Sequence, residues 1–273
     1  MRWPRPTEHP VSTPNSRVAW RFILPSLLVV TLLGLPLLAL FLRAADRDFF
    51  TYALSDMALA ALRLSLMTSL VSVAVSLLIG TPLAYILAHW EFKGQAVLEL
   101  LIDLPVVLPP SVAGLALLIA FGRQGIFGEW LTFFGISLPF TTTAVVIAQT
   151  FVSAPLYIRA ARLGFASIDP QLEEAAHVEG ANQWQMFSHV MLPLAGKALV
   201  SGGILAWTRA LGEFGATILF AGNLEGVTQT MPLAIYLGFE RNLDVAVVLS
   251  VVLVFVSLAL LMVMRKLDGN QFY

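Results

Sequence analysis

The sequence of 273 residues contains no cysteine and few charged residues. Without cysteine, the chain can form no disulfide, no thiolate metal site and no cysteine nucleophile. Aspartate, glutamate, lysine and arginine make up 12% of the residues, about half the share that is usual in soluble domains. So few ionisable groups cannot cover a surface that faces water. We therefore expect most of the surface to face lipid.

Patterns for nucleic acid, metal and nucleotide binding are also missing. The net charge is −1, whereas a nucleic-acid partner requires clustered lysine and arginine. The phosphate-binding pattern G-x-x-x-x-G-K-[ST] is absent, because the one Gly196-Lys197 pair is followed by alanine. The chain is therefore not expected to be an enzyme or to bind a cofactor or metal. The histidines lack metal-ligand spacing; they are His9, His89, His177 and His189.

Long uncharged runs make up much of the sequence. Of its residues, 58% are hydrophobic, and the mean hydropathy is +0.82. The first run, 22–42, lies between Arg21 and Arg43. At about 1.5 Å per residue it reaches about 31 Å, the thickness of a bilayer core. It is longer than the apolar region of a secretory signal, so we expect a retained helix. The proline-rich segment 1–21 before it is expected to be a disordered tail.

Six membrane helices are expected in a membrane domain that covers 22–267. Lipid offers no partner for loose backbone amides, and the period-two alternation of a barrel is absent, so the fold class is all-α. Prolines inside or at the ends of the runs can kink the helices; they are Pro82, Pro105, Pro109, Pro110 and Pro155. The six expected spans are 22–42, 64–88, 104–121, 138–158, 199–221 and 243–264.

The distribution of lysine and arginine predicts the orientation. If the amino terminus lies inside, ten basic residues fall in cytoplasmic segments and five in outer segments. This excess predicts a multi-pass protein of the cell (inner) membrane with both termini in the cytoplasm. The longest connection, 159–197, then also lies in the cytoplasm.

Residues 168–193 of this connection carry signals for two short helices. Asp169 can cap the first helix with Pro170 at its first position, where a missing amide costs nothing. Gly180 suits the end of that helix because glycine tolerates a left-handed conformation. Asn182 can cap a second helix, expected to run from Gln183 to about Val190 and to be ended by Pro193.

The same segment reads Glu174-Ala175-Ala176, three residues, Gly180, nine residues, then Val190-Met191-Leu192-Pro193. This resembles the EAA-x3-G-x9-I-x-LP loop of ABC importer permeases, with Val190 in the place of isoleucine. An amphipathic helix on the membrane surface is the alternative, but it would be richer in lysine and arginine. The resemblance implies that the loop couples to an ATPase subunit through Glu174, Ala175, Ala176, Gly180, Ala181, Leu192 and Pro193.

In the fifth expected span, Arg209 and Glu213 are four residues apart and can pair on one helix face. Charges at this depth are costly, at about 2.5–3.5 kcal/mol each, so neither should face lipid. The pair either lines a watery path or gate or locks helices together, and the residues alone leave both readings open. The glycines Gly212 and Gly215 and the Gly202-Gly203 pair allow close helix packing, or movement during gating.

The segment Arg209–Thr217, with Leu104–Ser111 and Gly122–Gly128, is similar to the molybdate and tungstate branch of these permeases. Sulfate permeases are close relatives. The resemblance covers about Ala58 to Leu267 and implies a type I ABC importer permease fold that acts as a dimer. It further implies a translocation path or gate that includes Arg209, Glu213, Gly212, Thr217, Pro109 and Ser111.

The expected function is therefore the membrane subunit of an ATP-driven importer for molybdate or tungstate. The implied partners are a second copy of the chain, two ABC ATPase subunits that hold ATP and Mg, an extracytoplasmic oxyanion-binding protein and the lipid bilayer. A sulfate-type permease is the alternative within the family. An ion-coupled secondary transporter is the alternative outside it, although the inverted repeat typical of that class is not found. A passive channel would not need the coupling loop.

Overall fold

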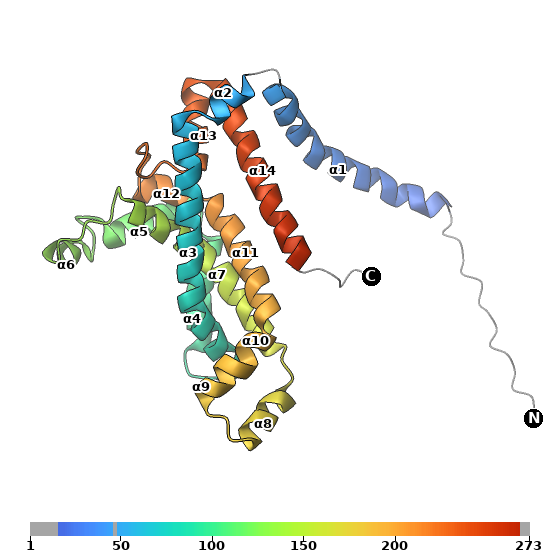
Figure 1. Ribbon diagram of the computed structural model, residues 1–273, viewed down its shortest axis with the longest axis vertical. Helices are drawn as coiled ribbons and strands as arrows, with labels where there is room; N and C mark the ends of the chain where they lie inside the picture. Colours follow the sequence, from blue (N-terminus) through green and yellow to red (C-terminus); the bar gives the residue numbers. More distant parts are fainter. Residues whose placement is uncertain (1–15, 46–47, 268–273) are drawn as a thin grey trace, which may run out of the picture. The chain divides into compact units, whose positions relative to one another are not determined.

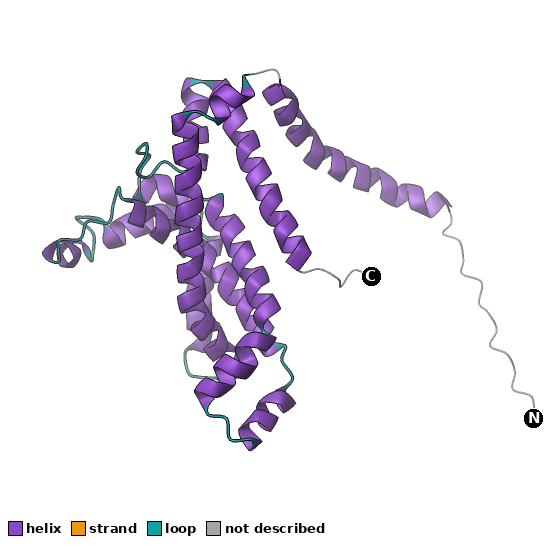
Figure 2. Cartoon of the chain, in the orientation of Figure 1, coloured by secondary structure: helices purple, strands orange, loops and turns teal. Residues whose placement is uncertain are grey.

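The computed structural model of the chain describes residues 16–45 and 48–267. Helices and their connections make up all of this described part (Figures 1 and 2). Internal contacts divide the chain into two units, 1–47 and 48–273. Residues 1–15 of the expected disordered tail lie outside the described residues. The all-α prediction is confirmed for the remainder.

The first unit consists of helix α1, Ser16–Ala45. It begins six residues before the expected start of the first span and contains Pro25 and Pro36. Nearly all of its described side chains are exposed, although most of them are large and apolar. Such a surface is stable in lipid and not in water. Residues 22–45 are long and apolar enough to cross a membrane.

The second unit is organised around α3, Asp56–His89, which follows the short helix α2, Phe49–Ala53. Ser55 begins α3, since its side chain accepts a hydrogen bond from the amide of Ala58 at 3.3 Å. A buried stripe of small residues runs along α3; it comprises Ser65, Ser69, Ser72, Ser76, Gly80 and Ala84. Small side chains allow neighbouring helices to approach closely, so α3 can serve as the central helix of this unit.

Three hydroxyls of the stripe also bond to neighbouring helices. Ser72 Oγ accepts from Thr150 of α7 (Thr142–Ala166) at 3.0 Å, and Ser69 Oγ accepts from the Trp207 indole of α11 (Gly196–Leu211) at 2.9 Å. Ser65 Oγ accepts from the first amide of α13 (Met231–Arg241) at 2.7 Å. Each bond satisfies a polar group in the interior and also fixes the register between two helices.

The remaining elements complete the chain between and after these helices. They are α4 (Gln95–Val107), α5 (Pro110–Phe121), α6 (Gly128–Phe133), α8 (Pro170–Val178), α9 (Gln183–Gln185), the π-helix η1 (Met186–Met191), α10 (Leu192–Leu194), α12 (Gly215–Phe220) and α14 (Leu243–Leu267).

Within the described residues, four segments can each cross a membrane by length and composition: 22–45, 56–89, 142–166 and 243–263. Two further pairs of consecutive helices are each bent at a short break. If each pair is one span, the number of candidate spans rises to six. The first pair joins α4 and α5 at 118°, and the second joins the 183–194 helical segment to α11 at 70°. The structure therefore accommodates six spans, but two of them are not straight helices.

The third expected span, 104–121, differs from the structure. The chain instead forms α4 and α5 with a break at Leu108 and Pro109. Pro110 begins α5 and cannot continue α4, because proline lacks the amide hydrogen and its ring clashes with the preceding turn. The bend lies at this point.

The fifth expected span, 199–221, is also interrupted. Helix α11 ends at Leu211, three residues follow without regular structure, and α12 begins at Gly215. The prolines in the other helices do not have this effect. Pro82 and Pro155 lie inside α3 and α7, which run on without a break.

Among the described residues of the second unit, three hydrophobic clusters form the core. The largest joins the ends of α3 and α7 to η1 and α11, around Tyr157 and Phe165. A second joins α5, α7 and α12 around Phe220, and the third joins α3, α13 and α14 around Met231. The connection that carries the Glu174-Ala175-Ala176 sequence is thus attached to the largest cluster, so movement there can reach α3 and α7.

The Gly202-Gly203 pair of α11 offers a test of this packing. A Cβ atom added at Gly202 would lie 2.7 Å from Cβ of Ala160, whereas one added at Gly203 would meet Leu77 Cδ1 at 3.5 Å. We expect Gly202→Ala to lower the free energy of unfolding by about 1–3 kcal/mol through overpacking. Gly203→Ala should be neutral or stabilising by up to about 1 kcal/mol, since alanine favours helix. Equal thermal unfolding midpoints of the two purified variants in detergent would contradict this packing.

Candidate functional site

The connection from Ser167 to Ala195, here named the EAA loop after Glu174-Ala175-Ala176, begins with α8 as the sequence predicts. The carboxylate of Asp169 accepts a hydrogen bond from the amide of Gln171 at 3.0 Å, and Pro170 occupies the first helical position. The acidic cap and Glu173 in the first turn favour this helix end electrostatically. Figure 1 shows α8 and α9 at the same end of the second unit.

A glycine turn ends α8. Gly180 has a φ of +86°, the left-handed conformation expected of it. The amide of Gly180 donates to the carbonyl of His177, and the amide of Ala181 donates to that of Ala176, both at 3.0 Å. These two bonds form the Schellman arrangement, which satisfies the last carbonyls of a helix. A Cβ added at position 180 would meet nothing within 4 Å, so a side chain there causes no clash. The left-handed backbone conformation is what disfavours a residue other than glycine.

The second half of the loop begins with a capping box. The Asn182 side chain accepts from the amide of Gln185, and the Gln185 side chain accepts from the amide of Asn182, both at 2.9 Å. The second helix was expected to end at Pro193, and the structure corrects this. The chain continues from α9 through η1 and α10, with Pro193 in the first turn of α10.

The π-helical segment explains how the helix passes Pro193. The amide of Leu192 donates to the carbonyl of Phe187, five residues earlier. In a regular α-helix, Pro193 would leave the carbonyl of His189 without a donor, and its ring would clash with that carbonyl. Wider turns of this kind resolve such conflicts and are frequent at functional sites.

The predicted coupling residues divide into an exposed and a packed group. Glu174 and Ala175 are exposed. Ala176 and Leu192 are partly buried against the largest core cluster. Apolar residues outside the predicted set are also open, since Val178 is 88% exposed and Trp184 is 71% exposed. An exposed apolar surface of this kind on a loop is typical of a protein interface.

A cavity of about 410 Å³ lies between the two halves of the EAA loop. Its lining combines backbone at the glycine turn with polar side chains from both halves. The lining residues are Ala176, Glu179, Gly180, Ala181, Gln185, His189 and Val190.

The break between α11 and α12 contains the Arg209–Glu213 pair. Arg209 Nη1 donates to Glu213 Oε2 at 2.6 Å, and the amide of Ala216 donates to Glu213 Oε1 at 2.8 Å. Glu213 is 1% exposed, whereas the Arg209 side chain is 34% exposed. Both carboxylate oxygens therefore accept a hydrogen bond, and the guanidinium, with five N–H donors, belongs to a side chain that is one third exposed.

The other residues predicted for the path lie around this break. A Cβ added at Gly215 would be 2.5 Å from Cβ of Pro110 and 3.3 Å from the amide nitrogen of Ser111. Thus the start of α12 packs directly on the start of α5. Pro109 and Ser111 are exposed, as is Gly212. Thr217 is buried, and within the described part of the chain its hydroxyl has no hydrogen-bond partner.

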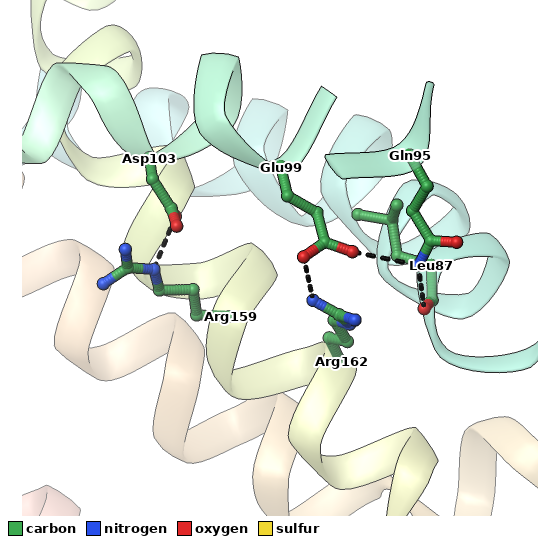
Figure 3. Close-up of polar contacts among 6 residues, drawn as sticks. All are labelled: Leu87, Gln95, Glu99, Asp103, Arg159 and Arg162. Atoms are coloured by element: carbon green, nitrogen blue, oxygen red, sulfur yellow. Dashed lines mark hydrogen bonds and ion pairs between the residues drawn. The ribbon is translucent and has the colours of Figure 1, made fainter. Parts of the chain in front are cut away.

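Two ion pairs that were not predicted join α4 to α7 (Figure 3). Arg159 Nε lies 2.5 Å from Asp103 Oδ1, and Arg162 Nη1 lies 2.9 Å from Glu99 Oε2. Glu99 also accepts from the Gln95 side chain at 2.9 Å. The spacing of Glu99 and Asp103 by four residues and of Arg159 and Arg162 by three was a usable signal, because each pair lies on one helix face.

Gln149 of α7 was also missed. Its side chain is fully buried, and neither side-chain amide atom has a hydrogen-bond partner among the described residues. A lone glutamine in a long apolar helix was the available signal, since polar residues in spans are costly and often functional.

A family model for the "binding-protein-dependent transport system inner membrane component" matches residues 80–267. The molybdenum transport system permease protein ModB of Mycobacterium tuberculosis is 40% identical over 244 residues, which cover 89% of this chain and 92% of the relative. The sulfate transport system permease protein CysT of Escherichia coli is 35% identical over 248 residues, with coverage of 89% and 90%.

A solved structure supports the fold independently. The bacterial alginate ABC transporter in complex with an alginate pentasaccharide-bound periplasmic protein contains a chain with a TM-score of 0.73. The match covers 92% of this chain and 94% of that chain at 18% identity. Family membership decides against the secondary transporter and the passive channel. The chain belongs to the binding-protein-dependent transport system inner membrane components, as the multi-pass permease subunit of an ABC importer whose ATPase is a separate subunit.

Proposed function

We propose that this permease carries molybdate or tungstate across the inner membrane. The observation that supports this most directly is the 40% identity to ModB over 89% of the chain. The similarity to CysT is lower at equal coverage, so sulfate is the second candidate. All three anions are tetrahedral oxyanions of the same charge. Selection among them is expected to depend on size and on the binding protein that delivers the anion.

The proposed assembly contains two copies of the chain, two ATPase subunits and one extracytoplasmic binding protein. Both termini lie in the cytoplasm in this proposal, because the lysine and arginine excess falls on that side. The EAA loop then faces the ATPase. Energy reaches the permease as movement of this loop, so the chain itself breaks no bond.

The docking surface is proposed to consist of the exposed residues of α8 and the glycine turn. Glu174 and Ala175 are open to a partner, whereas Ala176 and Leu192 attach the loop to the core that holds α3 and α7. The Schellman turn at Gly180 fixes the angle between the two halves. A displacement of α8 by the ATPase would therefore be transmitted to the spans.

Arg209 is proposed to contact the anion on its path. The Glu213 carboxylate already has two donors, one of which is the amide of Ala216 in the first turn of α12. Glu213 thus stabilises the helix break and holds the guanidinium in place. Because the Arg209 side chain is partly exposed, its guanidinium can bind an oxyanion through charge-assisted hydrogen bonds.

Reconstitution tests the proposed cargo. Proteoliposomes containing the permease, its ATPase and ATP should accumulate molybdate or tungstate when the binding protein is supplied outside, and sulfate more slowly. Uptake is measured with each anion alone and in competition. Omission of the ATPase is the control and should abolish accumulation. Preferential accumulation of sulfate would reject the molybdate proposal and leave the importer assignment intact.

The glycine turn is tested by three substitutions. Gly180→Ala should lower ATP-driven uptake, because the left-handed conformation costs a residue with a side chain about 1 kcal/mol or more. Gly180→Asn should be milder, since asparagine tolerates this conformation. Gly196→Ala is the matched control, because an added Cβ there also meets nothing within 4 Å. Uptake per ATP hydrolysed is the measurement. Equal values for Gly180→Ala and Gly196→Ala would show that the turn does not matter for coupling.

Arg209 is tested in a background that remains stable. Arg209→Ala alone leaves a buried, unpaired Glu213 carboxylate, which costs about 3–5 kcal/mol. In Arg209→Ala/Glu213→Gln the glutamine carbonyl can still accept from Ala216 and no charge is buried. We expect this double variant to insert normally and to lose uptake at least about tenfold, as for the loss of a charged hydrogen bond. Glu213→Gln alone should retain most uptake. Normal uptake by the inserted double variant would assign the pair a structural role only.

A further inference from the structure

Helix α4 is less deeply packed than α5, the other half of its bent span. Pro105 is the one buried residue among its thirteen, all of which the structure describes, whereas α5 buries three of its twelve. On the side that faces the core, Leu98 and Ile102 are only partly buried against the largest hydrophobic cluster. A helix with so little buried apolar area is held weakly by packing and can move as a unit.

Two ion pairs attach α4 to α7 (Figure 3). Asp103 pairs with Arg159, and Glu99, one turn earlier in α4, pairs with Arg162, one turn later in α7. The second pair is supported from within α4, because the Gln95 side chain donates to the same Glu99 carboxylate at 2.9 Å. The two helices are thus joined at two points along their length, so the pairs resist both sliding and rotation of α4 on α7.

The same end of α7 carries the EAA loop. Helix α7 ends where this loop begins, and its last turns also pack against the second half of the loop. Ala161 and Phe165 of α7 belong to the buried cluster that includes Met186 and Met191 of η1. At helical spacing, these two α7 residues share one face, and the two paired arginines share the neighbouring face. The end of α7 therefore lies between the EAA loop and α4.

The other end of α4 is the bend at Leu108 and Pro109, where α4 meets α5 at 118°. Two backbone bonds that would stiffen a continuous helix are absent there, because Pro109 and Pro110 lack the amide hydrogen. Beyond the bend, α5 packs on the start of α12, since a Cβ added at Gly215 would lie 2.5 Å from Cβ of Pro110. Movement of α4 about the bend can therefore reach the break between α11 and α12 that contains Arg209.

We propose that Glu99 and Asp103 are positioning residues that make α4 follow the end of α7, so that movement of the EAA loop changes the angle between α4 and α5. The proposal rests on the coupling role proposed above for the EAA loop. Packing of α4 is too slight to carry the helix along, whereas two ion pairs one turn apart hold it to α7. The change of angle is delivered to the contact between Pro110 and Gly215, beside Arg209.

The angle is followed by the distance between two spin labels, at Leu100 in α4 and Ile119 in α5, which are 70% and 54% exposed. The chain has no cysteine, so Leu100→Cys/Ile119→Cys supplies the only attachment points. Double electron–electron resonance is recorded on the permease with its ATPase in proteoliposomes, with and without the ATP analogue AMP-PNP. The nucleotide should shift the distance distribution. Singly labelled samples identify the distances between two copies of the chain.

Charge reversal tests the ion pairs. Glu99→Arg/Asp103→Arg replaces two attractive pairs by two repulsive ones. It should abolish the nucleotide-dependent shift and lower uptake per ATP hydrolysed at least about fivefold, the combined effect expected of two partly exposed pairs. Reversal of the partners as well should restore both measurements, in the variant Glu99→Arg/Asp103→Arg/Arg159→Asp/Arg162→Glu. The control is Glu91→Arg, which reverses an exposed charge just before α4 and should change neither measurement.

Three outcomes would overturn the proposal. A wild-type shift that persists in Glu99→Arg/Asp103→Arg, with or without a loss of uptake, would show that α4 does not depend on these pairs. Failure of the fourfold variant to restore the shift would show that the side chains do not act as pairs. Absence of any shift in the wild type would show that the angle does not change. Should the reversal insert poorly, Glu99→Gln/Asp103→Asn removes both pairs without repulsion and must also reduce the shift.

Failure of the proposed function would look different. The distance measurement requires the permease and its ATPase but neither the binding protein nor an anion. A wild type that shows the nucleotide-dependent shift but accumulates no oxyanion would reject the proposed cargo and leave the role of the ion pairs intact. Uptake without the shift would reject the role of the ion pairs and leave the cargo intact.

Discussion

Hydrocarbon offers no hydrogen-bond partner to a free backbone group, and this constraint governs how the helices of the permease can break. At the first break, Pro109 and Pro110 carry no amide hydrogen, so two backbone donors that would need a partner are absent. At the second, the Glu213 carboxylate accepts from the amide of Ala216 at the start of α12. Outside the hydrocarbon, in the EAA loop, the wider turn of η1 also keeps a backbone bond, from the amide of Leu192 to the carbonyl of Phe187. At each of these irregularities, local groups thus compensate for the helical backbone hydrogen bonds that are lost.

The same constraint explains where the few charges lie. Glu213 is buried with two donors, and Asp103 and Glu99 pair with arginines of α7. The α4–α7 pairs are half open to their surroundings, so each contributes less than about 1 kcal/mol to stability. Their effect is geometrical: two parallel contacts set the orientation of α4 on α7. A bent span needs such contacts, because its two halves do not orient each other.

Much of the local structure could be predicted from the sequence where a single residue determines it. Asp169, Gly180 and Asn182 each have one dominant backbone role, and the structure places them in those roles. The pairing of Arg209 with Glu213 followed from their spacing alone. The family followed from Glu174-Ala175-Ala176 and Gly180, because the pattern fixes several residue types at set distances.

The breaks could not be predicted in this way, because they depend on competition between local and tertiary contacts. Pro82 and Pro155 lie in continuous helices, whereas Pro109-Pro110 ends one. Composition does not distinguish these cases, since the neighbouring helices decide whether a kink is tolerated. The interruption after Leu211 depends on a side chain that accepts from a later amide, and Gly212 and Gly215 only permit it. The α4–α7 ion pairs needed the bend before their residues could meet.

The π-helical segment has a consequence for how this loop can change during evolution. Removal of one residue from Met186–Met191 would restore α-helical geometry but place the ring of Pro193 against the carbonyl four residues before it. It would also rotate everything before it by about 100° relative to α11. The surface around Glu174 would then face a different direction. The length of this segment is therefore more constrained than its composition, and substitutions should be tolerated there where insertions and deletions are not.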